Sequence, residues 1–140
     1  MKGLIIVMIV IAACIAGCND VEIGYLMTYN AKYVPDSMVV KARLDPENKD
    51  DAHREQFQIP WQSVKMEGVQ GTMPVRYQID KINNDELDQA TRDQFVIKDG
   101  GIVELPWNHN VPEGKYVISV KVFNEGHTQV LDSIFTVVIK

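Results

Sequence analysis

Apolar and polar residues alternate with a period of two through most of the chain after residue 25. A β-strand points successive side chains to opposite faces, so this alternation predicts strands with one face on a core and the other in water. The longest runs cover 38–44, 75–80, 116–123 and 135–139. Shorter candidate strands are Phe57 to Ile59, Trp61 to Met66, Gln94 to Lys98 and Ile102 to Leu105, with another near Tyr25 to Tyr33.

Residues typical of turns separate these runs: DPENKDD at 45–51, EGVQG at 67–71, KDGG at 98–101, NVPEG at 110–114 and NEG at 124–126. Many short strands between regularly spaced turns indicate an antiparallel sandwich or barrel. Only residues 84–93, NDELDQATRD, have a helical pattern, in which Asn84 can cap a helix of one or two turns. We therefore expect one all-β domain.

The first seventeen residues follow a different pattern. Lys2 precedes a uniformly apolar run from Leu4 to Ala16. As a helix this run would span about 20 Å, short of the ~30 Å hydrocarbon core of a bilayer. The run has no polar face, which argues against a surface helix of the folded domain. A cation, a short apolar stretch and small residues are typical of a secretory signal peptide.

The residues that end this run are Ile15-Ala16-Gly17-Cys18, and they resemble the lipobox of bacterial lipoproteins. The resemblance implies a diacylglyceryl group on the Cys18 sulfur, cleavage after Gly17 and an acylated new N-terminus. Several acyl chains would hold the protein firmly on a membrane. An ordinary cleaved signal beside a chance cysteine is the alternative. We expect a signal peptide over 1–17, a lipidated tether over 18–24 and a β-sandwich domain over 25–140.

The second half of the chain carries another resemblance. Phe95-x-Ile97, Gly114-x-Tyr116 and a final Phe-x-Val-x-Ile strand are similar to the cadence of cadherin-like and immunoglobulin-like domains. This implies an antiparallel sandwich of about seven strands, which is a fold and not an activity. With the lipobox, the chain resembles small accessory lipoproteins of Bacteroidota, some of which accompany glycan-uptake systems of the starch-utilisation type. The resemblance implies an outer-membrane location, and Asp20 and Glu22 after the cysteine favour display on the cell surface.

Charge and cysteine content narrow the classes further. The 140 residues carry a formal net charge of −5, and loss of Lys2 with a signal peptide makes it more negative. Such a chain lacks the basic surface that binds nucleic acid, so we expect no nucleic-acid partner. Lipidation of Cys18 and removal of Cys14 would leave no free thiol and no disulfide, so the domain would depend on its core.

The sequence shows no motif for catalysis. Gly-x-Ser-x-Gly, Gly-x-Gly-x-x-Gly and His-Glu-x-x-His are all absent from it. His53, His109 and His127 fall in three separate predicted loops without the spacing of metal ligands. We expect no enzyme, no cofactor and no metal site. The acidic loop 45–51 has oxygen ligands that suit calcium but lacks EF-hand spacing, so a solvated turn and a calcium site both remain open.

A binding role is better supported by one aromatic loop. Trp107 begins the sequence WNHN, and Trp107, Asn108, His109 and Asn110 are the predicted ligand-binding residues. Sugars stack their C–H faces on aromatic rings while their hydroxyls pair with polar side chains. The alternative for Trp107 is packing over the open end of the sandwich. Trp61 is the tryptophan that we expect in the core.

Two functions follow as hypotheses. The first is a non-catalytic lipoprotein of the cell envelope that captures a glycan or takes part in adhesion. The second is a structural module without a small-molecule ligand, which docks on another envelope protein. It could present an edge strand such as Val130 to Lys140, because an unpaired strand edge can accept a strand of a partner.

Overall fold

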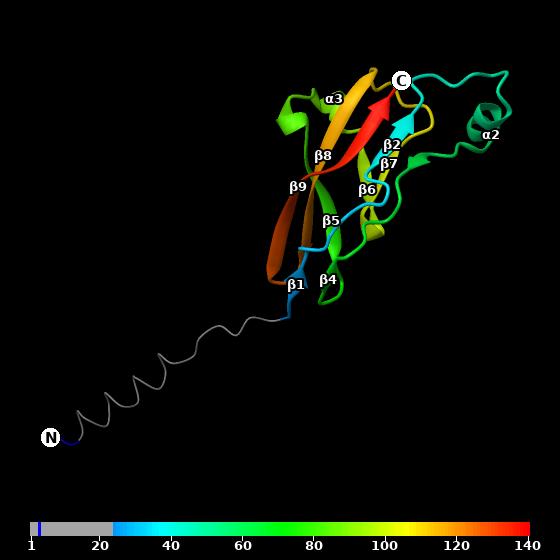
Figure 1. The fold of residues 1–140 in the computed structure, drawn as a ribbon. Coiled ribbons are helices and arrows are strands. Elements are labelled where there is room, and N and C mark those ends of the chain that lie inside the picture. Colours follow the sequence, from blue (N-terminus) through cyan, green and yellow to red (C-terminus); the bar gives the residue numbers. More distant parts are fainter. Residues whose placement is uncertain (1–2, 4–23) are drawn as a thin grey trace.

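The computed structural model describes Gly3 and residues 24–140 (Figure 1). A four-stranded sheet has the order β2 (Ser37–Val40), β9 (His127–Ile139), β8 (Gly114–Asn124) and β5 (Arg76–Ile82). A three-stranded sheet has the order β3 (Trp61–Gln62), β7 (Ile102–Leu105) and β6 (Val96–Lys98). β1 (Leu26–Met27) and β4 (Gln70–Gly71) form a short ribbon. The helical elements are α2 (Lys49–Phe57), α3 (Gln89–Arg92) and the 3-10 turns η1 (Asn83–Asp85) and η2 (Asp99–Gly101).

The core lies between the two larger sheets, on the apolar faces that the alternation predicts. The four-stranded sheet contributes buried side chains from β8 and β9, namely Tyr116, Ile118, Val120, Val122, Phe135, Val137 and Ile139. Val103 and Leu105 of β7 are fully buried from the other side. Full burial of one such side chain contributes about 1.5–3 kcal/mol, so these strands supply much of the driving force for folding. The expected all-β sandwich is confirmed.

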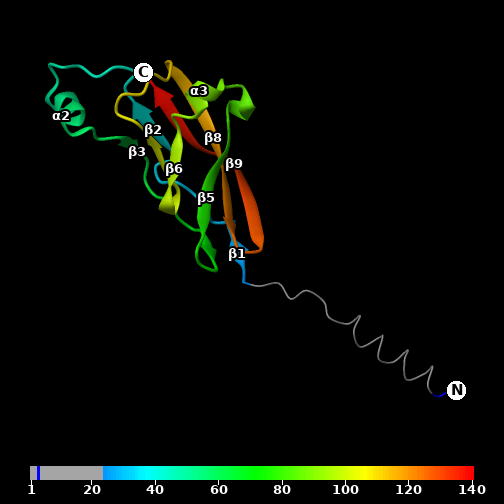
Figure 2. The same ribbon diagram turned by 180° about the vertical axis from the view of Figure 1, so that it is seen from behind.

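The sandwich has two distinct ends, which matter for the sites described below. The β8–β9 hairpin turns between the paired residues Asn124 and His127 at one end, and Gly114 pairs with Ile139 at the other. Gly24 lies at the hairpin end, where its carbonyl oxygen is 3.2 Å from His127 Nε2. Figures 1 and 2 agree that β1 lies at this end, whereas α2, α3 and the C-terminus lie at the opposite end.

The pairing of β2 differs from the antiparallel expectation. β2 runs parallel to β9, from Ser37 opposite Thr136 to Val40 opposite Ile139, and covers the last part of β9. The proposed edge strand from Val130 to Lys140 is therefore wrong in its second half, because β9 is an interior strand there. Alternation reports which face of a strand is buried, but it carries no information on the direction of the neighbouring strand.

The segment after β2 differs most from the structure that the sequence pattern predicts. Residues 45–51 were expected to form a turn and Phe57 to Ile59 a strand, but α2 spans Lys49–Phe57. Asn48 caps the helix by accepting hydrogen bonds from the Asp50 and Asp51 N–H groups, and these two acidic residues favour its positive N-terminal end. The helix KDDAHREQF has almost no apolar residues, so the periodicity that indicates helices is missing.

The second predicted helix is shorter than 84–93. It consists of η1 and the four-residue α3, and its cap is Asp88 and not Asn84, which lies within η1 at a positive φ of 56°. Cys18, Asp20, Glu22, the signal peptide apart from Gly3 and the tether apart from Gly24 lie outside the described residues. Within Gly3 and 24–140, no helix combines the length and apolarity needed to cross a bilayer.

Candidate functional site

The predicted loop WNHN connects β7 to β8 at the end of the sandwich that carries α2. Trp107 is half-buried and lines an open pocket of about 310 Å³. The other walls come from the segment after β2, with Arg43, Leu44 and Pro46, and from Glu55 of α2. One wall of the pocket therefore comes from α2, a helix that the sequence pattern did not predict.

Three polar side chains of this pocket are available to a ligand. Arg43, Glu55 and Asn108 are exposed and make no side-chain hydrogen bond or ion pair with any other residue of the described part. Lys41 also lines the pocket, but its ammonium group is bound to the Asp51 carboxylate at 2.7 Å and 2.9 Å. The pocket thus combines one aromatic ring with a free guanidinium, a free carboxylate and a free amide.

His109 has a different role from the one predicted. It is buried, and its Nδ1 accepts a hydrogen bond from the Val111 N–H at 3.2 Å. An acceptor nitrogen carries no proton, so Nε2 is the protonated nitrogen and donates to the Lys41 carbonyl oxygen at 2.9 Å. Both ring nitrogens are occupied within the fold. His109 therefore fixes the loop against the segment after β2, and its polar atoms are not free to bind a ligand.

Asn110 faces a neighbouring hollow. It lines a space of about 380 Å³ together with Val111, Pro112 and Glu113, and its backbone N–H donates to Gln94 Oε1 at 2.9 Å. Of the four predicted residues, the structure brings Trp107 and Asn108 into one pocket with polar groups that are free. Asn110 lines the adjacent hollow. His109 is buried and fixes the loop through the hydrogen bonds of its two ring nitrogens.

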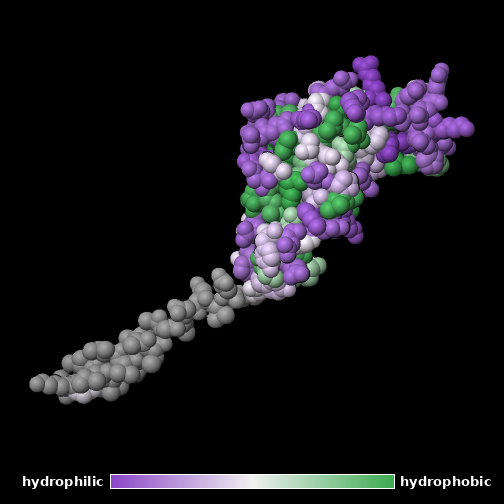
Figure 3. All heavy atoms as spheres, viewed as in Figure 1, coloured by the Kyte–Doolittle hydropathy of each residue, from purple (hydrophilic) through white to green (hydrophobic). Residues whose placement is uncertain are grey.

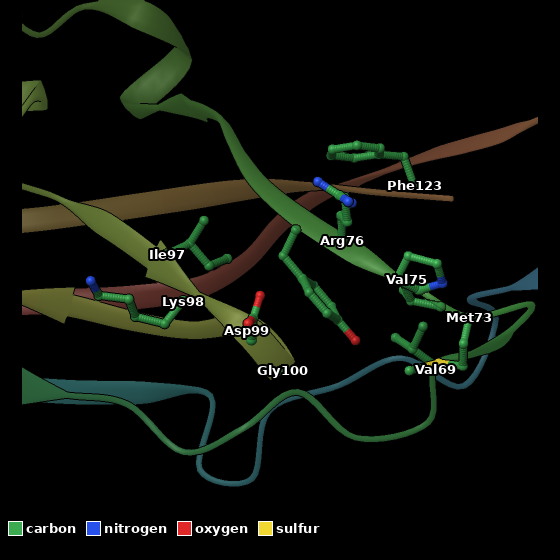
Figure 4. Close-up of a pocket in the computed structure, with 11 residues that line it drawn as sticks. Val69, Met73, Val75, Arg76, Ile97, Lys98, Asp99, Gly100 and Phe123 are labelled. Carbon is green, nitrogen blue, oxygen red and sulfur yellow. The ribbon is translucent and has the colours of Figure 1, made fainter. Parts of the chain in front are cut away.

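A larger groove of about 700 Å³ lies on the side of the sandwich, and the sequence analysis did not find it. It follows the edge of β5 that pairs with no other described strand, next to η2, and Tyr77 and Asp99 are among its lining residues. Figure 4 shows Val69, Met73 and Val75 gathered toward one end of the groove, with Lys98 toward the other. Burial raises the pKa of the Tyr77 hydroxyl, so it stays protonated at neutral pH.

Sequence spacing gave no direct signal for this groove. Its walls come from three segments that are distant along the chain, around residues 69–77, 97–100 and 123. The alternating pattern of the sequence predicted only that Tyr77 and Phe123 lie on strands. Their meeting depends on the pairing of β5 with β8, in which Arg76 lies opposite Phe123.

Two other predicted features are placed as follows. Trp61 is half-buried and packs against the core, with the Arg54 guanidinium 3.7 Å from its ring centroid. In the acidic loop 45–51, the Asp45 carboxylate accepts the Glu47 N–H, and the Asn48 side chain caps α2. Across Gly3 and residues 24–140, no group of three His, Cys, Asp or Glu side chains is arranged to hold a metal ion.

The architecture defines the class of this chain as an all-β sandwich domain. No family model and no curated protein matches the sequence. A solved structure of similar fold is a SusE-like, surface-located polysaccharide-binding protein from the heparin utilisation locus of Bacteroides thetaiotaomicron. The two align with a TM-score of 0.50 and 15% identity, over 84% of this chain. The aligned part is 15% of the other protein, so this chain corresponds to a small part of a longer one.

Proposed function

We propose that this chain is a non-catalytic, lipid-anchored domain of the bacterial cell surface that binds a glycan through the Trp107 pocket. The observation that carries the proposal is the half-buried Trp107 ring beside free polar groups at the end of the sandwich opposite Gly24. The fold likeness to a surface polysaccharide-binding protein supports it. An anchor on Cys18 would reach the domain at the Gly24 end, so the pocket would face away from the membrane.

The chemistry of the pocket suits a sugar. A pyranose presents C–H groups on one face, which pack on an indole ring, and hydroxyls around its rim, which both donate and accept hydrogen bonds. Arg43 and Asn108 supply donors, and Glu55 and Asn108 supply acceptors. The pocket is open, as expected for a surface that holds part of a long chain and not a whole small molecule.

The anchor rests on Cys18 and is tested by mass spectrometry of the mature protein. We expect a mass that corresponds to a chain starting at Cys18 and carrying acyl groups. Cys18→Ser should leave an uncleaved, unlipidated precursor. Normal processing of that variant, or a bare Cys18 thiol in the native protein, would contradict the lipobox assignment.

The glycan site is tested by affinity electrophoresis through gels that contain neutral plant and host polysaccharides or heparin. Loss of a central aromatic contact costs about 2 kcal/mol or more at a binding hot spot, so Trp107→Ala should weaken binding by at least about thirtyfold. Lys98→Ala, in the groove beside β5, is the matched control and should retain full affinity.

The possible results of this experiment distinguish a wrong assignment of the binding site from an absence of glycan binding. If Lys98→Ala abolishes retention and Trp107→Ala does not, a glycan binds in the groove beside β5, and the assignment to Trp107 is wrong. If no polysaccharide retards the unmodified protein, glycan binding itself is contradicted. Circular dichroism of both variants checks that the sandwich is intact.

A docking module is the second candidate, and one feature favours it. β2 pairs with β9 only from Thr136 onward, and within the described strands nothing pairs with that side of β9 before this point. Val130 is 51% exposed there. Such an edge can accept a strand from a partner. Crosslinking from position 130 to one envelope protein, combined with no glycan retention, would favour this function.

A further inference from the structure

The end of the domain at which Gly24 lies has an unusual surface. Charged residues make up 24% of the chain, yet the stretches 24–31 and 68–75 contain none. Tyr29 and Met73 are 79% and 78% exposed, and Tyr25 is half exposed. We call residues 24–31 and 68–75 together the uncharged end.

The two stretches form one fixed surface. β1 pairs with β4, and the Thr72 N–H donates to the Tyr25 carbonyl oxygen at 3.0 Å. Asn124 Nδ2 donates to the carbonyl oxygens of both Tyr25 and Thr72, which ties the β8–β9 hairpin to the same surface. Gly68 has a positive φ of 79°, and a Cβ there would lie 2.0 Å from the Asn30 carbonyl oxygen. The exposed aromatic and thioether groups therefore stand on a closely packed base.

The polarity of the molecule changes from this end to the other. Lys32 and Glu67, which pair across a β-bridge, border the two stretches on one side. The exposed Arg76 directly follows Val75, and Glu125 lies on the adjoining hairpin turn. In Figure 3 the end near β1 is coloured mainly in pale shades, and the strongest purple gathers at the opposite end over α2. Charge is thus concentrated away from the uncharged end.

The short length of chain between the uncharged end and Cys18 indicates that this surface lies near the lipid bilayer. Residues 18 to 24 span at most about 20 Å when fully extended. The sandwich is longer, since the eleven residues of β8 span about 35 Å. A lipid on Cys18 would therefore keep the uncharged end within reach of the bilayer surface. Tyrosine side chains favour the lipid headgroup region, where the ring meets acyl chains and the hydroxyl meets water.

We propose that the uncharged end rests on the lipid surface, with Tyr25, Tyr29 and Met73 in the headgroup region, and that it orients the domain on the membrane. This inference rests on the anchor at Cys18 that belongs to the proposed function. The acyl chains hold the protein, and the uncharged end makes a second, weaker contact that selects one orientation. The Trp107 pocket is then directed away from the bilayer.

The test uses the full lipidated protein in vesicles of phosphatidylethanolamine and phosphatidylglycerol. A mature chain whose only cysteine is acylated has no free thiol, so Tyr29→Cys and Met73→Cys each introduce a unique site for a nitroxide label. Phe57→Cys at the end of α2 is the matched control, because Phe57 is also exposed, at 60%, but lies at the opposite end. Electron paramagnetic resonance then measures collisions with oxygen, which concentrates in lipid, and with a nickel chelate, which stays in water.

We expect a higher ratio of oxygen to nickel collisions at positions 29 and 73 than at 57. Tyr25→Asp should lower the ratio at position 73, because a carboxylate resists transfer out of water, whereas Glu55→Gln at the far end should leave it unchanged.

Equal ratios at 29, 73 and 57 in vesicle-bound protein would overturn the inference and leave the anchor standing. Exclusion of both reagents from 29 and 73 would indicate a protein contact and also overturn it. Protein that carries no acyl group and does not float with vesicles would overturn the anchor and the inference together.

Discussion

Asp51 is a residue whose environment has a measurable consequence for stability. Its carboxylate lies in the first turn of α2, is almost fully buried and accepts hydrogen bonds from Lys41 Nζ and from the Asp45 N–H. The bond from Lys41, followed by the bond from Asp45, lowers the pKa of Asp51 below its ordinary value although burial opposes this shift. One side chain thus joins α2 to the segment that follows β2.

The lowered pKa predicts how stability depends on pH. The folded state favours deprotonated Asp51 more than the unfolded chain does, so the stabilisation is complete above the unfolded pKa of about 3.9 and is lost as pH falls through the lower folded pKa. Urea denaturation at about pH 7 and at about pH 3 measures this loss. Asp51→Asn should be less stable at neutral pH and should lose less on acidification. An unchanged difference between the two pH values in the variant would contradict this role of Asp51.

The residue scale also shows which part of the candidate site could be predicted. The sequence WNHN correctly indicated that Trp107 and Asn108 lie on a loop at one end of the sandwich. It could not separate His109 from its neighbours, because histidine is both a frequent ligand residue and a good internal hydrogen-bonding residue. That distinction depends on Lys41, whose carbonyl oxygen is 68 positions away in the sequence.

At the scale of elements, an irregularity crosses the four-stranded sheet. The register of β8 with β9 shifts between Ile118 and Val120, and that of β5 with β8 shifts at the same level. Ser119 lies at this level and is 2% exposed. Its hydroxyl donates to Asp132 Oδ1 at 2.8 Å and accepts the Ser133 N–H at 2.9 Å. The side chain thus replaces hydrogen bonds that the irregular strand cannot form with its neighbour.

Ser119→Ala should therefore be more destabilising than an ordinary polar substitution in a strand. It removes the two hydrogen bonds of the buried Ser119 hydroxyl, to Asp132 and from the Ser133 N–H, at a cost of about 1 kcal/mol or somewhat more in the free energy of unfolding. The hydrogen bond from Ser119 is also the main cause that lowers the pKa of Asp132, so this pKa should rise in the variant. Urea denaturation and nuclear magnetic resonance titration measure the two effects.

Ser37→Ala, at an exposed position at the start of β2, is the control for this change. We expect it to alter stability by less than about 0.5 kcal/mol, as is usual for exposed positions without special contacts. Equal stabilities of Ser119→Ala and Ser37→Ala, with no change in the titration of Asp132, would show that Ser119 does not support the irregular register.

The sandwich was predictable from the sequence because burial against the core imposes a period of two on most of each long strand. β5, β8 and the second half of β9 appear where alternation places them, whereas the first half of β9, His127 to Ile134, has mostly exposed side chains and was not predicted from alternation. α2 was not predictable from periodicity, since its stability comes from the Asn48 cap and the bond between Asp51 and Lys41 and not from an apolar face. The uncharged end was also missed, because it forms only when two stretches about forty residues apart pair through β1 and β4.

At the scale of the whole molecule, the two proposed contacts occupy opposite ends of one sandwich. The hairpin turn at Asn124 lies beside the uncharged end, and Gly114, at the other end of β8, follows the loop that carries Trp107. A separation of about 35 Å along β8 far exceeds the distance over which substitutions normally influence each other. The domain would therefore act as a spacer that holds a glycan site at a fixed height above the membrane.

This arrangement predicts that the two sites are energetically independent. Trp107→Ala should weaken glycan binding and leave the collision ratio at position 73 unchanged, whereas Tyr25→Asp should lower that ratio and leave glycan affinity unchanged. In the double variant the glycan affinity should match that of Trp107→Ala within about 0.5 kcal/mol and the collision ratio should match that of Tyr25→Asp, because the two sites lie at opposite ends of the sandwich. Glycan titrations and collision ratios are measured on vesicle-bound protein for the unmodified chain, the two single variants and the double variant. A loss of glycan affinity in Tyr25→Asp would mean that the glycan reaches the uncharged end, in which case that surface belongs to the binding site and the membrane must contact the domain elsewhere.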